Sequence, residues 1–508
     1  MERLGVMIVR FDDENPANMT EIWRQLLPGI ALEKLESERY LDNMENTVSD
    51  ISHEMMRQLF VEQWRLTDQA LTNRYYEEHA SDEGVMRDGF DSIKVATRFG
   101  IVNLPRQICK NYKQNHHVLP GNDGLPSHRG QITTRGLQEW VCLLPMDLSF
   151  ASAQRLLGWI TGDPNTISET QIRRWVSFHG KLIREVERTE VEELSARKNL
   201  DGLQAQMATI KESHHPAAWG QELDESVKMA LEQPDNSPPK GVSLGDWERV
   251  LKSRSDEREL HKLRRLGPEV RPGEIIVGTD DVCVRRPEKR RWLDLRTACV
   301  RTSEGIRYLS GTPETVLPQL YLLLLLCGGI NSKLTLLGDG ARWIARFFTE
   351  WLSSWTATEM ILDWYHLAKK CSDFASMICR GSLARKKLLG QLFYYLWRGE
   401  TQHVLSILQD YRSQAKNVEV LDSLIEYLTD RLLFLPNYKQ RRENRQFIGS
   451  GFVEKANDLI VSRRQKNQGM HWSQDVSDGL AALKTIMLNQ GWDQYWQQSK
   501  VLSLAIAV

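Results

Sequence analysis

The hydrophobic pattern of the chain changes near residue 274, and this change constrains the fold more than any other feature. Three runs rich in β-branched residues follow one another at 274–284, 290–300 and 305–311, with short turn-like segments between them. Such spacing predicts three strands in an antiparallel meander. The chain then alternates apolar helical runs with two short strands, 333–339 and 359–363. The sequence therefore predicts an α/β domain built on a mixed sheet.

Three antiparallel strands followed by helix, strand, helix, strand and helix is the order of a ribonuclease H-like core. We expect residues 273–370 to form the first part of this α/β catalytic core. Residues 371–446 are predicted to be a helical insertion, rich in aromatic and basic residues. Residues 447–508 are expected to return to the core with one further helix and a tail.

The region before the core is predicted to be mainly α-helical with a small β element. Residues 1–90 show apolar residues at helical spacing, and 91–211 combine two short strands with three helical segments. Residues 212–272 hold several prolines and then a basic helix, which is typical of a linker.

A break between two of these helices bears on function. Gly162 and Pro164 end one helix, and Ser168 is placed to cap the next, which carries Arg173 and Arg174 on its first turns. This layout fits a helix-turn-helix whose second helix enters a DNA major groove. An ordinary helical hairpin explains the pattern equally well.

Composition limits the classes of protein that fit. Lys and Arg number 66 and Asp and Glu 67, for a net charge of -1, so binding to nucleic acid requires clustered basic residues. The 7 cysteines form no CxxC pair, which excludes a disulfide framework and favours a reducing compartment. The most apolar run, 316–327, is too short for a membrane span. We therefore expect a soluble, cytoplasmic protein.

Two aspartates stand where neighbouring strands of the predicted sheet bring them together. Asp280 lies in the first strand and Asp339 ends the fourth. Carboxylates inside apolar strands repel each other unless a cation lies between them, and hard oxygen ligands suit Mg²⁺ or Mn²⁺. Two such ions about 3.5–4 Å apart would bind the attacking and leaving oxygens of a phosphodiester. Glu454, on a helix introduced by a Gly-Ser-Gly turn, is the candidate third ligand.

Four segments of this region carry a resemblance to a known family: GTDDVCV, LLGDGARWIARF, ILDWYHLAKK and IGSGFVEKANDLIVSRRQKNQGMHWS. They resemble bacterial insertion-sequence transposases of the ISKra type, which are related to the Mutator-like group. Segments between residues 97 and 183 are also similar to that family, so the resemblance covers roughly residues 90 to 500. Its most specific motif is the Gly-Ser-Gly-x-Val-Glu block that ends at Glu454.

The resemblance implies a DDE transposase in which Asp280, Asp339 and Glu454 hold two Mg²⁺ or Mn²⁺ ions. Its substrate would be double-stranded DNA at transposon ends and targets, cut and joined in a homodimer or larger assembly. The family has Asp-Gly where this chain has Asp280-Asp281. Register favours Asp280 as the ligand, with its neighbour on the opposite strand face as the alternative.

Asp363 and His366 match the Asp-x-x-His element of Mutator-like transposases. The resemblance implies that both approach the scissile phosphate or the metals. Asp363 is equally explained as a helix N-cap, and His366 as a core histidine with satisfied hydrogen bonds.

Basic residues cluster around the predicted metal site, as a path for a phosphate backbone requires. The candidate DNA contacts are Arg285, Arg286 and Arg290 in the first hairpin turn, and Arg441, Arg442, Arg463 and Arg464 near the final helix. Tyr394, Tyr395 and Trp397 could stack on an unpaired base, although such an aromatic stripe more often packs in a core.

These patterns favour a transposase that binds terminal inverted repeats and catalyses metal-dependent strand cleavage and strand transfer. Two other functions stay open. One is a structure-selective nuclease on the same core, without strand joining. The other is a non-catalytic helix-turn-helix DNA-binding protein.

Overall fold

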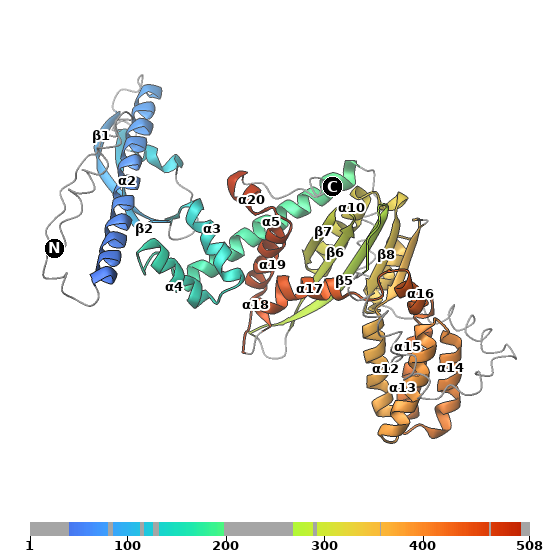
Figure 1. Ribbon diagram of the computed structural model, residues 1–508. Coiled ribbons are helices and arrows are strands. Elements are labelled where there is room, and N and C mark those ends of the chain that lie inside the picture. The colour runs from blue at the N-terminus through green and yellow to red at the C-terminus, as the bar shows by residue number, and fades with distance from the viewer. Residues whose placement is uncertain are drawn as a thin grey trace. The chain divides into compact units, whose positions relative to one another are not determined.

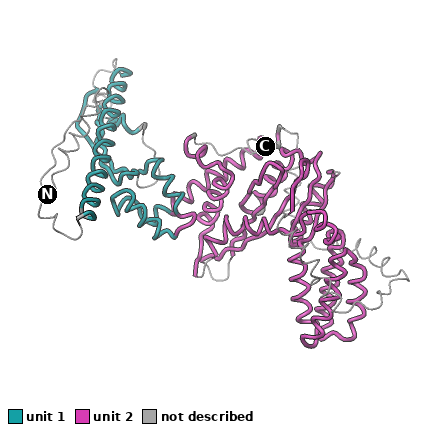
Figure 2. The backbone as a smooth tube through the Cα atoms, in the orientation of Figure 1, with its two compact units in different colours: residues 1–144, 149–172 teal, residues 145–148, 173–508 magenta. Residues whose placement is uncertain are grey.

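The computed structural model describes residues 40–79, 85–111, 116–124, 132–197, 268–287, 292–355, 357–466 and 469–498 (Figure 1). The chain divides into two compact units (Figure 2). Unit 1 comprises residues 1–144 and 149–172, and unit 2 comprises 145–148 and 173–508. The basic helix expected near 251–266 and Arg290 lie outside the described residues.

Unit 1 contains a sheet with strand order β3-β2-β1-β4. Its strands are β1 (Val85–Thr97), β2 (Gly100–Asn111), β3 (His116–Val118) and β4 (Ile132–Thr133). The long helix α2 (Tyr40–Glu78) packs on β2 and covers the buried side chains of Val95, Val102 and Leu104. Strands and helix therefore share one small core.

The boundary expected at residue 90 was wrong, because β1 begins at Val85 and runs through it. The first half of β1 is exposed and polar, so it lacks the apolar alternation that signals a strand. The turn between β1 and β2 ends at Gly100, whose φ of 100° suits glycine.

Three helices follow: α3 (Arg135–Leu143), α4 (Phe150–Thr161) and α5 (Glu169–Arg197). Short 3₁₀ turns lie at Pro120–Gly124 and Leu144–Met146. Gly162, in the left-handed conformation, ends α4. Ser168 Oγ accepts a hydrogen bond from the Gln171 backbone N–H, and Gln171 Oε1 accepts one from the Ser168 N–H at 2.8 Å. This reciprocal capping box confirms the predicted helix start.

Unit 2 is built on a five-stranded mixed sheet with strand order β7-β6-β5-β8-β9. The strands are β5 (Glu274–Arg285), β6 (Trp292–Thr302), β7 (Gly305–Gly311), β8 (Lys333–Gly338) and β9 (Thr358–Leu362). β5, β6 and β7 form an antiparallel meander, while β8 pairs parallel with β5, and β9 with β8. The structure confirms the predicted mixed α/β fold and its five strands.

Helices surround this sheet. α10 (Pro313–Leu326) packs on β6 and β7, and α19 (Gln474–Leu488) packs on β7. α17 (Gly451–Asn457) packs on β5 and β6. The remaining elements are α11 (Arg342–Arg346), α18 (Arg463–Gln465), α20 (Trp492–Gln498), a 3₁₀ turn at Gly329–Asn331, and π-helical turns at Phe347–Trp351 and Asp458–Ser462.

The helical insertion follows β9. It comprises α12 (Trp364–Ile378), α13 (Ser382–Trp397), α14 (Thr401–Asp410), α15 (Val418–Thr429) and α16 (Tyr438–Glu443), with 3₁₀ turns at Tyr411–Gln414 and Leu432–Phe434. Figure 1 shows α12 to α15 side by side, and α12 packs against α13 and α15. The expected boundary at residue 371 was therefore wrong, because it falls inside α12.

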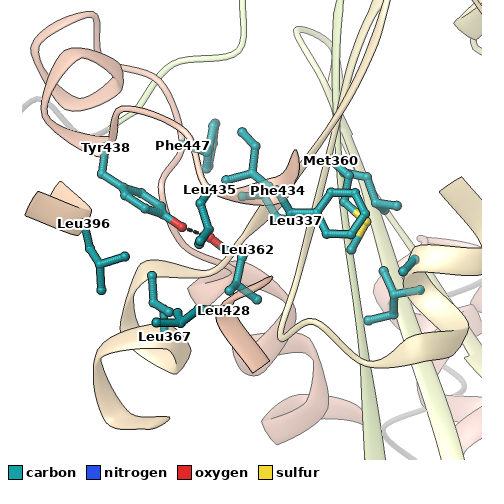
Figure 3. Close-up of a cluster of buried hydrophobic side chains, with 14 of the residues drawn as sticks. Leu337, Met360, Leu362, Leu367, Leu396, Leu428, Phe434, Leu435, Tyr438 and Phe447 are labelled. Atoms are coloured by element: carbon teal, nitrogen blue, oxygen red, sulfur yellow. Dashed lines mark hydrogen bonds between the residues drawn. The ribbon is translucent and has the colours of Figure 1, made fainter. Parts of the chain in front are cut away.

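The insertion and the sheet share one hydrophobic core. Figure 3 shows Tyr438 reaching the end of β9, where its hydroxyl donates a hydrogen bond of 2.8 Å to the Leu362 carbonyl. Tyr395 is buried and Trp397 packs on Tyr438, which supports the core interpretation of the aromatic stripe. No helix in the described part of the chain is long and apolar enough to cross a membrane.

Candidate functional site

Asp280 and Asp281 lie on opposite faces of β5, because side chains alternate along a strand. Asp281 is exposed and accepts hydrogen bonds from Arg296 at 2.9 Å and from the Trp343 indole at 2.8 Å. The Arg296 guanidinium in turn stacks on the Trp343 ring at 4.0 Å. Asp281 thus belongs to a hydrogen-bonded cluster on the surface, while Asp280 lies on the opposite, half-buried face of β5.

Asp280 is a half-buried carboxylate that is costly to ionise. Burial raises its pKa to about 6; the Asp281 backbone N–H opposes this rise, and the negative charge of Asp339 adds to it. His366 also acts electrostatically on Asp280. Burial and a nearby second carboxylate both raise the pKa of a carboxyl group. A bound cation has the opposite effect, because it stabilises the ionised form.

Asp339 directly follows β8, the strand that pairs in parallel with β5. Its Oδ1 accepts a hydrogen bond of 2.8 Å from the Ala341 N–H. Gly340 between them has φ 85°, and a Cβ there would lie 2.7 Å from Arg431 Nε. The glycine therefore lets the chain turn sharply after Asp339.

Glu454 lies in the first turn of α17, with its side chain 55% exposed. Its Oε1 is 3.8 Å from His366 Nε2. α17 approaches β5 closely because residue 278 is glycine: a Cβ there would lie 2.7 Å from Phe452 and 3.1 Å from Val453 Cβ. This close packing fixes the backbone position of Glu454 relative to β5.

His366 links the carboxylates of this site. The hydrogen-bonding interaction with Asp363 raises its pKa most, burial opposes it, and the charges of Asp363, Asp339 and Glu454 raise it further. Its Nδ1 lies 3.5 Å from Asp363 Oδ1, at ion-pair distance, and has no closer hydrogen-bond acceptor among the described residues. Together with Asp280, on which it also acts electrostatically, His366 thus lies among carboxylates from four different segments of the chain.

Asp363 is 1% exposed and caps α12. Its Oδ1 accepts from the backbone N–H groups of Tyr365 at 2.6 Å and His366 at 2.9 Å. Its Oδ2 accepts from the backbone and hydroxyl of Ser450, in the turn before α17. Burial would raise its pKa, but interactions with His366 and Ser450 outweigh it and lower the pKa to about 2. These contacts support the N-cap interpretation of Asp363.

Asn457 is a site residue that the sequence did not reveal. Its Nδ2 donates a hydrogen bond of 2.5 Å to Asp280 Oδ2, and its Oδ1 accepts from the Thr297 hydroxyl on β6. The side chain therefore ties the helix of Glu454 to the strand of Asp280. The available signal was a polar residue one turn after Glu454, beside the apolar stripe of Val453 and Ala456.

Two of the arginines expected to contact DNA are buried instead. Arg441 forms an ion pair with Glu359 at 2.9 Å and donates to the Phe447 carbonyl. Arg464 donates to the Pro145 carbonyl and stacks on Trp472. Both side chains are buried and make these contacts within unit 2, so neither is accessible to a phosphate backbone.

The other candidate arginines are more accessible. Arg173, Arg174, Arg285 and Arg463 are exposed, while Arg286 and Arg442 are half-buried. Arg463 donates to Asp458 at 3.1 Å, and Arg442 lies 5.9 Å from the Trp397 ring.

The donor set fits a divalent cation in kind. Asp280, Asp339 and Glu454 supply hard carboxylate oxygens. Burial, and to a lesser degree the charge of Asp339, raises the pKa of Asp280, and a bound cation would favour its ionised form. No three His, Cys, Asp or Glu side chains in the described ranges lie close enough together to hold a metal. Binding a cation would therefore require these side chains to turn toward a common point.

Comparison with known proteins adds no assignment: no protein-family model matches the chain, and no curated protein matches it. The functional argument rests on the geometry of the site.

Proposed function

We propose that the chain is a DDE-type DNA transposase with a ribonuclease H-like core. The observation that carries the proposal is the position of Asp280 and Asp339 on two adjacent parallel strands, with the electrostatic coupling of both to His366 near Glu454. The strand order β7-β6-β5-β8-β9 supports the ribonuclease H-like assignment.

Asp280, Asp339 and Glu454 would hold Mg²⁺ or Mn²⁺ in this proposal. The ions supply Lewis-acid stabilisation of the attacking and leaving oxygens in phosphodiester cleavage and strand transfer. Asn457 keeps the Asp280 carboxylate in a fixed orientation. Asp363 holds His366 and the turn before Glu454 in register, because it bonds to both segments.

DNA recognition is assigned to exposed basic side chains. Arg173 and Arg174 lie on the first turns of α5, behind a capping box like that of a recognition helix. Arg285 and Arg463 lie on elements next to the catalytic candidates and would contact phosphates. Joining two transposon ends would require a homodimer or larger assembly.

The test is incubation with the inverted-repeat DNA of the element that encodes the chain, with Mg²⁺ or Mn²⁺. We expect nicks at the end boundary and joined products, both absent for Asp280→Asn. Asp281→Asn, which changes the adjacent carboxylate on the opposite face, serves as the matched control and should cut normally. Cleavage without end specificity or joining would favour a nuclease, and end binding without cleavage would favour a non-catalytic DNA-binding protein.

A further inference from the structure

A cleft of about 510 Å³ opens beside the β5–β6 hairpin, on the strand face opposite to Asp280. It is lined by Cys283 and Arg285 from β5, Trp292 from β6, Gln465 at the end of α18, and Lys466, Gly469 and Met470 from the segment after it. Its volume lies within the range of about 300–1,000 Å³ that is usual for ligand sites.

The back wall of this cleft is held rigidly. The Gln465 side chain is 1% exposed and exchanges hydrogen bonds with Ser477. The Trp472 indole donates to the Gln465 carbonyl at 3.0 Å, and the Trp472 backbone N–H donates to the Arg285 carbonyl at 2.9 Å. Trp472 therefore links β5, which carries Arg285, to the segment that carries Lys466 through two hydrogen bonds.

The open side of the cleft offers unused binding groups. Trp292 is 53% exposed, and the Arg285 guanidinium lies 5.5 Å from the centre of its ring. Among the residues that the structure describes, neither Arg285 nor Lys466 has a carboxylate within ion-pair distance. The cleft thus combines an exposed indole with two such cations in its lining. Single-stranded nucleic acid is bound by this combination of a stacking surface and positive charges for the backbone.

The Cys283 thiol beside the cleft is hydrogen-bonded to the Asp294 carboxylate. Cys283 Sγ donates to Asp294 Oδ1 at 3.1 Å. Desolvation and this hydrogen bond raise the pKa of the Cys283 thiol to about 11, so the thiol stays protonated at neutral pH. It therefore serves as a neutral wall of the cleft and not as a nucleophile or thiolate ligand.

We propose that the cleft of Cys283, Arg285, Trp292, Lys466 and Met470 binds one unpaired DNA base, stacked on Trp292 and flanked by phosphates paired with Arg285 and Lys466. The inference extends the proposed function to a strand that leaves the duplex near the cleavage site. It rests on the proposal that the chain acts on DNA, but it needs neither metal nor cleavage. The ligand class is single-stranded DNA or a duplex with an unpaired base.

The test uses the full chain and a single-stranded oligonucleotide with one 2-aminopurine, whose fluorescence falls on stacking, in metal-free buffer. We expect quenching by the wild-type chain. Trp292→Ala should abolish the quenching and weaken binding about tenfold or more, whereas Trp292→Phe should keep both. Trp159→Ala, which removes an exposed tryptophan of α4 outside the cleft, is the matched control and should behave as wild type. Melting temperatures show whether each variant is folded.

A second variant tests the two cations. Arg285→Ala with Lys466→Ala should weaken binding and flatten its salt dependence, while quenching at saturating protein remains. Unchanged quenching in Trp292→Ala, or an equal loss of affinity for fully paired and single-stranded DNA, would overturn the proposal. Failure of end cleavage with Mg²⁺ would overturn the proposed function alone, because stacking is measured without metal.

Discussion

Asp280 shows how one side chain can be unfavourable for folding and useful for function. Its pKa is about 6 in the folded chain and near 3.8 when unfolded. Well below pH 3.8 the Asp280 carboxyl is protonated in both states, so its burial then carries no charge penalty. As the pH rises through 6 it ionises in the folded state too, and the full cost of about 3 kcal/mol at most is then present.

Asp280→Asn should therefore stabilise the chain at neutral pH and only slightly at pH 4. In metal-free buffer we expect a higher melting temperature for the variant at pH 7, with the difference vanishing as the pH falls. Thermal unfolding monitored by circular dichroism across this range measures it. Asp281→Asn, which changes the exposed carboxylate on the opposite face of β5, is the control variant. A gain of equal size at both pH values in Asp280→Asn would contradict the buried-charge explanation.

Asn457 is predicted to act through Asp280. Asn457→Ala leaves the Asp280 Oδ2 and the Thr297 hydroxyl without their partner, which should cost about 1–3 kcal/mol of stability. If Asp280 binds a cation, losing its hydrogen-bonded neighbour should weaken Mn²⁺ affinity about 10- to 100-fold. Titration calorimetry with Mn²⁺ measures the affinity. Reduced stability with unchanged affinity would limit Asn457 to a packing role, and Thr297→Val should show a smaller effect on affinity.

At the scale of elements, the position of α17 depends on the absence of a side chain at residue 278. Gly278→Ala would place a methyl group 3.1 Å from Val453 Cβ and 2.7 Å from Phe452 Cζ. The Phe452 ring would have to shift, and α17 would be displaced from β5 by a few tenths of an ångström at Val453. We expect a loss of about 1–3 kcal/mol and a larger loss of cleavage, since Glu454 moves with the helix. Gly451→Ala, at the start of the same helix, meets nothing within 4 Å and should keep both stability and cleavage.

The elements of the sheet were readable from local pattern because each strand of unit 2 is a short β-branched run bounded by turns. Alternation along β5 also indicated that Asp280 and Asp281 face opposite sides. Asn457 was not readable, because its partners Asp280 and Thr297 lie 177 and 160 positions away. The surface positions predicted for Arg441 and Arg464 were wrong for a related reason. Arg441 pairs with the distant Glu359 carboxylate and Arg464 with the distant Pro145 carbonyl, and composition shows neither contact.

At the scale of the whole molecule, a net charge of -1 means that DNA binding must come from local basic groups and not from the overall field. The structure lowers the number of such groups, because Arg441 and Arg464 are internal. Arg173 and Arg174 gain importance as a result. They are exposed at the capped start of α5, while the carboxylate site lies on β5, β8 and α17. Recognition and chemistry are therefore expected to be separable by mutation.

Arg173→Ala with Arg174→Ala should reduce binding to the transposon end far more than binding to random DNA, if α5 reads bases in the major groove. Each bidentate contact to a base contributes about 1–3 kcal/mol of discrimination, so the double variant should lose at least about tenfold in specific affinity. Its melting temperature should change little, because both side chains are exposed. Arg188→Ala, further along the same helix and also exposed, is the matched control. Fluorescence anisotropy with both DNAs at several salt concentrations separates the outcomes. An equal loss of affinity for both DNAs, with a shallower salt dependence, would show that these arginines contact only phosphates. Unchanged affinity for both would mean that α4 and α5 form a structural hairpin.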